Sequence, residues 1–290
     1  MKLGIILGGG GQVGIAWETA VLAALTQHAG LDVNAAAVIA GTSAGAFVGA
    51  TAASGADLAA LTDQEIIGST LSPVPPPPPA QQDSGTGTAV VPDDITKIVT
   101  SREGTVRERS AAVGQLALAA TPVVDEETYL QLLATMFTPR EWPATTDLRI
   151  TSAHCTTGET VLWSRNHGID LMRAVASSCA IPGFFPPVQH NGDYYCDAPR
   201  TPFCATLAET EQLDRILFIG PDIPVLAGMD EKHELDRLKA NGTPVVAITG
   251  SPSFDEVGKE LMDAAARPRA AEIGLQDGHA AAAEVISLLW

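Results

Sequence analysis

The sequence predicts a three-layer α/β/α fold with a mainly parallel central sheet, and two observations predict it. Short apolar runs alternate with stretches of helical periodicity along much of the chain, an order typical of parallel strands covered by helices. The composition, 46% hydrophobic and 18% charged with 27 glycines and 20 prolines, suits a globular protein with many turns. We expect residues 1–290 to form a single domain.

The apolar runs mark the expected strands, and the periodic stretches mark the expected helices. The strands are predicted over residues 3–7, 37–40, 148–152, 160–163, 215–219 and 244–248. The helices are predicted over residues 15–25, 44–53, 113–120, 129–137 and 169–178, and beyond residue 256.

Between residues 57 and 145 this alternation weakens, and we expect a helical excursion from the core there. The run Pro75–Pro79 is incompatible with a helix or an inner strand. With its Gly- and Gln-rich neighbours it predicts a flexible loop over residues 72–94. Two interpretations stay open, a lid or cap and a surface insertion without function.

The chain is strongly acidic, with a formal net charge of −17, which disfavours nucleic acid as a partner. The short apolar run at residues 3–7 lacks the apolar core and the cleavage site of a signal peptide. No apolar stretch is long enough to span a membrane. We therefore expect a cytoplasmic protein. The four cysteines, spaced unlike a zinc site, are expected to be reduced and mostly buried, with no metal and no cofactor; they are Cys155, Cys179, Cys196 and Cys204.

The segment Gly41-Thr42-Ser43-Ala44-Gly45 lies between an expected strand and an expected helix. In this context Gly-x-Ser-x-Gly forms a sharp turn that exposes the serine hydroxyl, because Gly41 and Gly45 remove side chains where strand and helix nearly touch. The helix N-terminus adds positive dipole beside the hydroxyl. Ser43 is therefore the candidate nucleophile, and the alternative is an ordinary serine N-cap.

A run of glycines follows the first expected strand, and its N–H groups can converge on one point. Such a nest stabilises the oxyanion of acyl transfer, so Gly9, Gly10 and Gly11 are the candidate oxyanion hole. The same run matches the dinucleotide fingerprint Gly-x-Gly-x-x-Gly. That reading lacks its acidic partner, because Asp32 falls before the second strand and not at its end.

A serine nucleophile needs a base, which is commonly a histidine oriented by a carboxylate. None of the six histidines sits in a catalytic motif, although His233 and His279 follow the serine in an order that leaves a triad open.

Four blocks of the chain together resemble the patatin-like phospholipase family, whose members use a Ser-Asp dyad without histidine. Residues 9–14 resemble its oxyanion motif, residues 41–45 its nucleophile elbow, residues 176–182 its Ala-Ser-x-x-x-Pro loop, and residues 193–198 its strand ending in aspartate. The resemblance implies that Asp197 is the base. Read without it, the alternative is that Asp197 caps a following helix.

The chain departs from that family at two places. Val13 stands where the family usually has arginine or lysine, and Ala198-Pro199 replaces two small residues after the aspartate. The apolar segment Ile181–Pro187 is expected either to receive an acyl chain or to be part of the core.

The expected function is that of a serine esterase or lipid hydrolase acting through Ser43 and Asp197. Its partners would be a lipid or ester substrate and, transiently, a membrane surface; the oligomeric state stays open. The alternatives are a catalytically silent module of the same fold that binds acyl chains or a protein partner and, with less support, a dinucleotide-binding protein.

Overall fold

The computed structural model describes residues 1–68, 93–101, 103–197, 203–222, 230–258 and 261–290. The expected loop over residues 72–94 falls almost entirely outside the described residues. Its C-terminal end is the start of a helix, since residues 93 and 94 already belong to α4.

The described strands form one sheet in the order β5-β6-β3-β2-β1-β7-β8, with β4 also paired to β3. The pairs from β3 to β8 through the centre of the sheet are parallel, and β4, β5 and β6 add an antiparallel margin. The strands are β1 (Leu3–Leu7), β2 (Val38–Gly41), β3 (Leu148–His154), β4 (Thr160–Trp163), β5 (Val188–His190), β6 (Asp193–Cys196), β7 (Arg215–Ile219) and β8 (Val245–Ile248).

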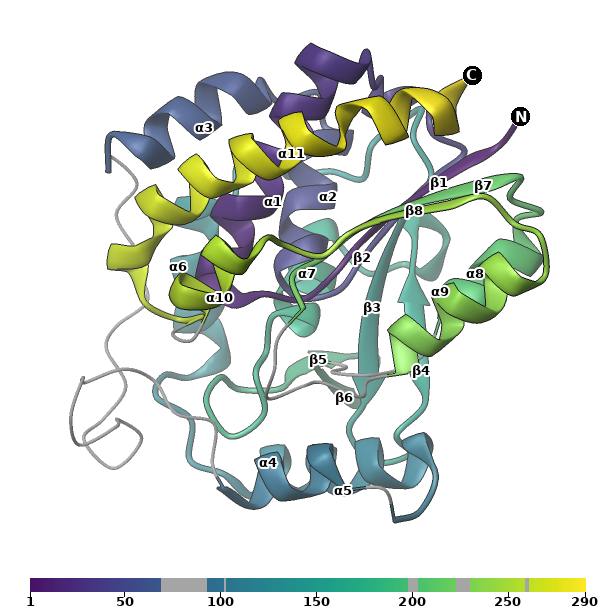
Figure 1. The fold of residues 1–290 in the computed structure, drawn as a ribbon. Coiled ribbons are helices and arrows are strands. Elements are labelled where there is room, and N and C mark those ends of the chain that lie inside the picture. The colour runs from purple at the N-terminus through teal and green to yellow at the C-terminus, as the bar shows by residue number, and fades with distance from the viewer. Residues whose placement is uncertain (69–92, 102, 198–202, 223–229, 259–260) are drawn as a thin grey trace.

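Helices cover both faces of this sheet, as Figure 1 shows. The described helices are α1 (Gly11–Ala29), α2 (Ala44–Ala53), α3 (Leu58–Ile66), α4 (Asp93–Thr100), α5 (Val106–Ala119), α6 (Glu126–Met136), α7 (Leu171–Ser178), α8 (Cys204–Thr210), α9 (Asp230–Ala240), α10 (Pro252–Val257) and α11 (Arg267–Leu289). Short 3₁₀ turns are η1 (Val33–Ala35), η3 (Arg165–His167) and η6 (Ala264–Ala266). The expected α/β/α fold with a mainly parallel sheet is confirmed.

The two faces of the sheet belong to different hydrophobic clusters because side chains alternate along a strand. Ile5 and Leu7 pack in the larger cluster beneath α1, α2 and α11. Ile6 points the other way, into the smaller cluster formed with α8 and α9. Strand β1 is buried on both faces, as expected for the centre of a parallel sheet.

Several expected boundaries coincide with the observed ones, notably those of β1, α2, β4 and β7. Helix α1 begins earlier than expected, at Gly11, because the glycine run itself starts the helix. Among the described residues, no helix has the length and hydrophobicity needed to cross a membrane.

Helices α4 and α5 lie side by side at one end of the sheet, below β5 and β6 in Figure 1. Helix α5 begins with a capping box, in which Thr105 and Glu108 satisfy each other's backbone N–H groups. It lies directly on the end of β3, since a Cβ atom at Gly114 would stand 2.2 Å from the carbonyl oxygen of Cys155. This contact fixes α5 over the sheet end that carries the candidate site.

Candidate active site

Ser43 occupies the turn between β2 and α2 in a backbone conformation that side chains rarely adopt, with φ 53° and ψ −114°. The neighbouring glycines make this turn possible. A Cβ atom at Gly41 would lie 2.2 Å from the carbonyl oxygen of Gly45, and one at Gly45 would lie 2.3 Å from that of Leu7. Such strain in a non-glycine residue is typical of functional turns.

Hydrogen bonds hold the strained turn from several sides. The N–H of Gly45 donates to the carbonyl oxygen of Gly8 at 2.8 Å, and the N–H of Thr42 donates to that of Leu7 at 3.1 Å. The N–H of Ser43 itself donates to Oγ of Ser178 at 2.8 Å. The turn is therefore tied both to the glycine loop after β1 and to the end of α7.

The glycine loop lies beside the serine, as expected for neighbouring parallel strands. Leu7 pairs with Gly41 in the β1–β2 register, and a Cβ atom at Gly9 would stand 3.7 Å from Cβ of Ser43. Within the described residues, no hydrogen bond uses the N–H groups of Gly9, Gly10 or Gly11 as donors. These groups are thus available to an oxyanion near Ser43.

Asp197 follows β6 at the level of the serine turn. Gly41 pairs with Ile150 of β3, and Cys196 pairs with Ala153 of the same strand. One residue further on each side, Thr42 and Asp197 therefore align with Thr151 and Ser152. The first alignment is visible in a hydrogen bond of 2.7 Å between the Oγ1 atoms of Thr42 and Thr151.

The carboxyl group of Asp197 is buried, and its residue is 8% exposed. Its N–H donates to the carbonyl oxygen of Ala180 at 3.0 Å. The hydrogen bonds between described residues include none that joins the Ser43 hydroxyl to the Asp197 carboxylate. The structure thus brings both residues to the α7–β5 segment but leaves their side chains without a direct hydrogen bond.

Cys179 lies between the two. Its thiol donates to the carbonyl oxygen of Ser43 at 3.2 Å. Burial, together with the negative charge of Asp197, raises the pKa of the Cys179 thiol far above its usual range. The same causes, with Cys179 as a further contributor, raise the pKa of the buried Tyr129 hydroxyl, which donates to the carbonyl oxygen of Ala176 at 3.0 Å. These two groups near Asp197 therefore stay protonated and uncharged at neutral pH.

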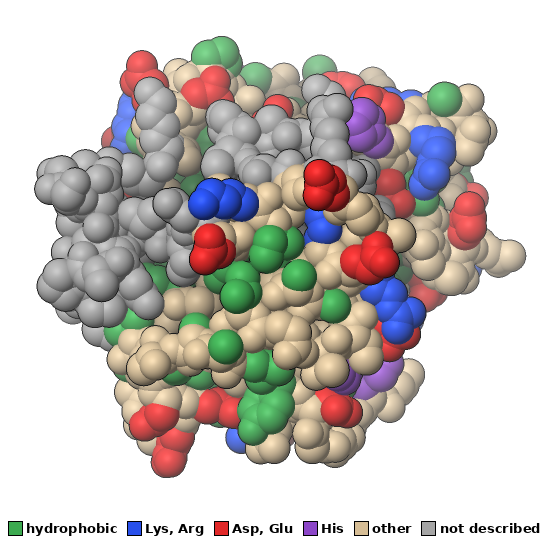
Figure 2. Space-filling view, turned by 90° about the horizontal axis from the view of Figure 1, so that it is seen from below, with side chains coloured by type: hydrophobic (Ala, Val, Ile, Leu, Met, Phe, Trp, Pro, Cys, Tyr) green, Lys and Arg blue, Asp and Glu red, His purple; other side chains and the backbone are tan. Residues whose placement is uncertain are grey.

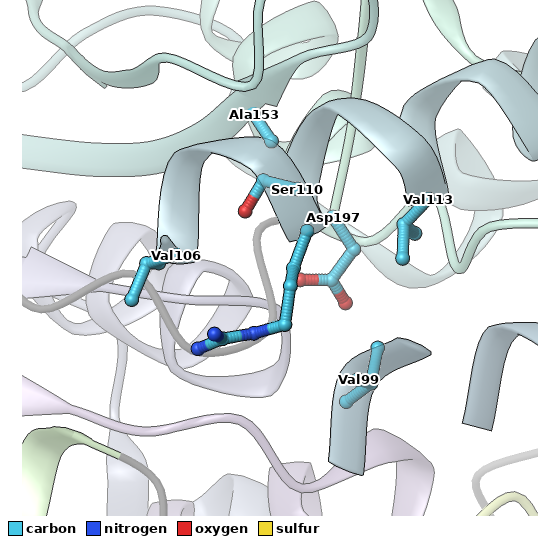
Figure 3. Close-up of a pocket in the computed structure, with 7 residues that line it drawn as sticks. Val99, Val106, Ser110, Val113, Ala153 and Asp197 are labelled. Carbon is cyan, nitrogen blue, oxygen red and sulfur yellow. The ribbon is translucent and has the colours of Figure 1, made fainter. Parts of the chain in front are cut away.

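A small cavity opens beside Asp197, with about 20 Å³ of free space, enough for roughly one water molecule. Figure 3 shows the Asp197 carboxylate between Val99 of α4 and Val113 of α5. The other described residues of the lining are Val106, Arg109, Ser110 and Ala153. The helical excursion before β3 thus forms one wall of the candidate site.

The two histidines that left a triad open do not contact Ser43 or Asp197. His279 is exposed on α11 and meets His28, with ring centroids 4.6 Å apart. His28 lies in the last turn of α1, about 25 Å from the glycine end of that helix at 1.5 Å per residue. His233 is exposed on α9, which packs on α8 and β8.

Asp32 lies far from the position a dinucleotide would need. It caps the turn η1 before β2, accepting from the N–H of Asn34 at 3.0 Å. That position is at the amino end of β2, whereas the glycine loop and Ser43 follow the carboxyl ends of β1 and β2.

The structure also locates one of the two departures from the family and the apolar segment Ile181–Pro187. Val13 belongs to α1 and is fully buried in the core, so a cation there would lie in an apolar environment. Residues 198 and 199 lie outside the described residues. Phe184 and Phe185 are buried in a cluster with Tyr129, and Phe185 stacks on the Tyr129 ring, so these two side chains belong to the core. The cysteines are free and mostly buried, as expected.

Comparison with known proteins finds one protein family that matches part of the chain. Residues 95–198 match the model of the family described as patatin-like phospholipase. This stretch, less than half of the chain, is therefore similar to the patatin-like phospholipase family. The matched stretch ends one residue after Asp197. It does not include the glycine loop or Ser43, which lie before residue 95. No match was found among curated proteins.

Several solved structures are similar to this chain at low sequence identity. The human cytosolic phospholipase A2 GIVD, in complex with methyl γ-linolenyl fluorophosphonate, is 12% identical with a TM-score of 0.50, over 99% of this chain and 58% of that one. VipD from Legionella pneumophila is also 12% identical, with a TM-score of 0.47, over 99% and 67%. ExoU from Pseudomonas aeruginosa, solved with SpcU, is 16% identical with a TM-score of 0.35, over 95% and 52%. This chain thus spans about three fifths of the human structure's length.

Sequence reasoning missed two residues that the structure places at the site. Ser178 was noted only as part of a motif, and its role as acceptor for the Ser43 N–H depends on a contact across 135 residues. Arg109 lies on α5, whose start was expected at residue 113 and is found at Val106. The capping-box pattern Thr105-x-x-Glu108 is the signal that identifies the earlier start.

Proposed function

We propose that this patatin-like protein hydrolyses a carboxylic ester of a lipid, with Ser43 as the nucleophile. The observation that carries the proposal is the strained backbone of Ser43, held beside the glycine loop at the carboxyl ends of two parallel strands. A strained nucleophile next to unused N–H donors is the arrangement that acyl transfer requires.

In the proposed reaction the Ser43 oxygen attacks the ester carbonyl carbon, and its proton passes to the Asp197 carboxylate. The N–H groups of Gly9, Gly10 and Gly11 stabilise the negative oxygen of the tetrahedral intermediate. When that intermediate collapses, the alcohol leaves with the proton held by Asp197. Water then attacks the acyl-enzyme and gives a proton to Asp197. When the second tetrahedral intermediate collapses, Asp197 returns this proton to the Ser43 oxygen, the acid leaves and both side chains are restored.

Asp197 suits the role of base because it is a buried carboxylate at the end of β6, beside the serine turn. A carboxylate can act as a general base when it is held within reach of the proton it accepts. The missing hydrogen bond to Ser43 is compatible with this role, because catalytic hydrogen bonds are often long before substrate binds. The position of His279, at the far end of α1, supports the dyad over a triad.

The cavity beside Asp197 has room for about one water molecule, so an ester needs additional space. Among the described elements, helix α4 packs chiefly against α5, and a displacement of α4 would open the cavity that Val99 lines. The face seen in Figure 2 carries hydrophobic side chains among charged ones of both signs. Transient contact of this face with a lipid surface is part of the proposal.

The test is hydrolysis of short p-nitrophenyl esters by purified protein. Ser43→Ala should lower kcat/KM by roughly a thousandfold or more, because the nucleophile is deleted. Asp197→Asn should do nearly as much damage. Matched controls are Ser54→Ala, an exposed serine that follows α2, and Asp193→Asn, an exposed aspartate at the start of β6, and both should stay near the wild-type rate. Undiminished turnover in Ser43→Ala would refute the proposal.

A catalytically silent binding module is the second candidate. It is favoured by one observation, that the Ser43 hydroxyl and the Asp197 carboxylate share no hydrogen bond. Such a module would bind short-chain fatty acids or esters at equilibrium without turning them over, and wild-type protein and Ser43→Ala would bind them equally.

A further inference from the structure

The cavity beside Asp197 contains a second charged residue, Arg109 of α5. The other described side chains of the lining are apolar apart from Ser110. Arg109 is half-buried, so its guanidinium is neither locked in the core nor fully in solvent. A basic and an acidic group thus share one small, mainly apolar space.

The guanidinium of Arg109 has only one of its ends engaged. Its Nη1 donates to the carbonyl oxygen of Gly104 at 2.8 Å. Within the described ranges it forms no ion pair with a carboxylate, Asp197 included. Because an arginine has five N–H donors in a planar fork, most of them remain available on the cavity side or toward solvent.

The neighbouring arginine on the same helix behaves differently. Arg107 pairs with Glu159 at 2.9 Å on the surface, where both side chains are more than half exposed, and its Nε donates to the carbonyl oxygen of Thr157 at 3.1 Å. Its charge is therefore already compensated. The two residues, two positions apart, provide a natural contrast between a compensated and an uncompensated cation.

The uncompensated cation matters because the protein as a whole carries a net charge of −17. A field of that sign opposes the approach of an anionic substrate. The glycine-loop position Val13 offers no compensation, since it is apolar and buried. A guanidinium binds phosphate and carboxylate groups through paired hydrogen bonds.

We propose that Arg109 is a specificity-determining residue, which binds an anionic phosphate or carboxylate group of the ester while Asp197 serves the scissile bond. The inference rests on the proposed function for the identity of the ligand as an ester. In this proposal Arg109 of α5 recognises the negative charge, and Asp197 at the end of β6 takes part in the reaction.

The experiment compares pairs of hexanoyl esters that differ in one anionic group. Dihexanoyl phosphatidate is compared with dihexanoylglycerol, and hexanoyl lactate with its methyl ester. Binding is measured by calorimetry in the Ser43→Ala background, and kcat/KM in the Ser43 protein. We expect the anionic member of a pair to be preferred, and Arg109→Gln to reduce that preference by roughly ten- to a hundredfold, as for loss of hydrogen bonds to a charged group.

Two further variants sharpen the result. Arg109→Lys keeps the charge but loses the planar fork, so it should restore only part of the preference. Arg107→Gln removes a cation from the same helix and should leave the preference at its wild-type value. A preference confined to the phosphatidate pair identifies the anion as phosphate, and one found in both pairs identifies it as any small anion.

The inference is overturned if Arg109→Gln keeps the wild-type preference in the binding measurement, whether or not the Ser43 protein turns the esters over. If Arg109→Gln fails to fold, the salt dependence of the wild-type preference decides: it should shrink from about 20 mM to about 500 mM salt, and a constant preference contradicts the role. Absence of turnover with Arg109-dependent binding intact would instead refute only the proposed hydrolase function.

Discussion

The backbone N–H of Ser43 donates a hydrogen bond of 2.8 Å to the hydroxyl of Ser178, at the C-terminal end of α7. The next residue, Cys179, donates its thiol to the Ser43 carbonyl oxygen, and Ala180 accepts from the N–H of Asp197. Three consecutive residues therefore connect the serine turn to the candidate base. This segment sets the position of Ser43 relative to Asp197.

Removal of the Ser178 hydroxyl should therefore loosen the serine turn. In Ser178→Ala the N–H of Ser43, which is buried, loses its acceptor, and an unsatisfied buried donor costs about 1–3 kcal/mol. We expect the free energy of unfolding in urea to fall by that amount and kcat on p-nitrophenyl esters to fall with it. Ser287→Ala, an exposed serine on α11, is the control. Unfolding of Ser178→Ala at the wild-type urea concentration would show that the bond is dispensable.

The glycines of the serine turn should tolerate a methyl group less well than a glycine one helical turn later. Gly45→Ala gains about 1 kcal/mol of helix propensity, but its Cβ would lie 2.3 Å from the backbone oxygen of Leu7, an overlap that only backbone movement relieves. In Gly49→Ala the nearest atoms are side-chain methyl groups of Ile39 and Leu7, at 3.2 and 3.3 Å.

We therefore expect Gly45→Ala to lose about 2 kcal/mol or more of unfolding free energy, as for overpacked cores, and Gly49→Ala to stay within about 1 kcal/mol of wild type. Thermal and urea unfolding measure both. Equal stability of the two variants would mean that strand and helix are not as close at Gly45 as the structure has them.

Local sequence patterns are sufficient to predict the strands and helices that are regular. Residues 3–7 and 44–53 have the predicted boundaries because apolar run and turn glycines coincide there. Helix α9 was not expected, because only a few of its residues, such as Leu235 and Leu238, face the core. The antiparallel hairpin of β5 and β6 has three and four residues, too short for periodicity to distinguish from a loop.

The site was predictable to the extent that it lies in sequence-local turns. Ser43 and the glycine run each follow a recognisable strand, so parallel pairing alone brings them together. Arg109 and Ser178 reach the site through tertiary packing across long sequence separations. Such contacts leave no pattern in a single sequence.

Stability should fall at alkaline pH because of buried acidic groups near the site. Burial raises the pKa of the Cys179 thiol and of the Tyr129 hydroxyl above their usual values near 9 and 10. A hydrogen bond with Cys155, together with burial, raises the pKa of the Cys196 thiol. Above about pH 9 these groups lose protons in the unfolded chain and keep them in the folded one. The unfolded state then binds fewer protons, so the free energy of unfolding decreases as pH rises.

Urea unfolding between about pH 8 and about pH 10.5 measures this decrease. Cys179→Ser, which replaces the thiol by a hydroxyl that does not titrate in this range, should make the decrease shallower. An unfolding free energy that rises across the same interval would contradict the buried, protonated state of these groups.

The histidines should be dispensable for ester hydrolysis. His279 contacts His28 at the end of α1 opposite the glycine loop, and His233 is exposed on α9. We expect His279→Ala and His233→Ala to change kcat/KM by less than about threefold, whereas loss of a catalytic base costs a hundredfold or more. A loss of that size in either variant would favour a triad over the Ser43–Asp197 pair.

The identity of the nucleophile is tested most directly by reaction of the folded protein with a fluorophosphonate, followed by mass spectrometry of the intact chain and of its peptides. The account predicts one adduct per chain, on the peptide that contains Ser43, and its loss in Ser43→Ala but not in Ser54→Ala. A folded protein that acquires no adduct, or that carries it on another residue, would contradict the assignment of Ser43.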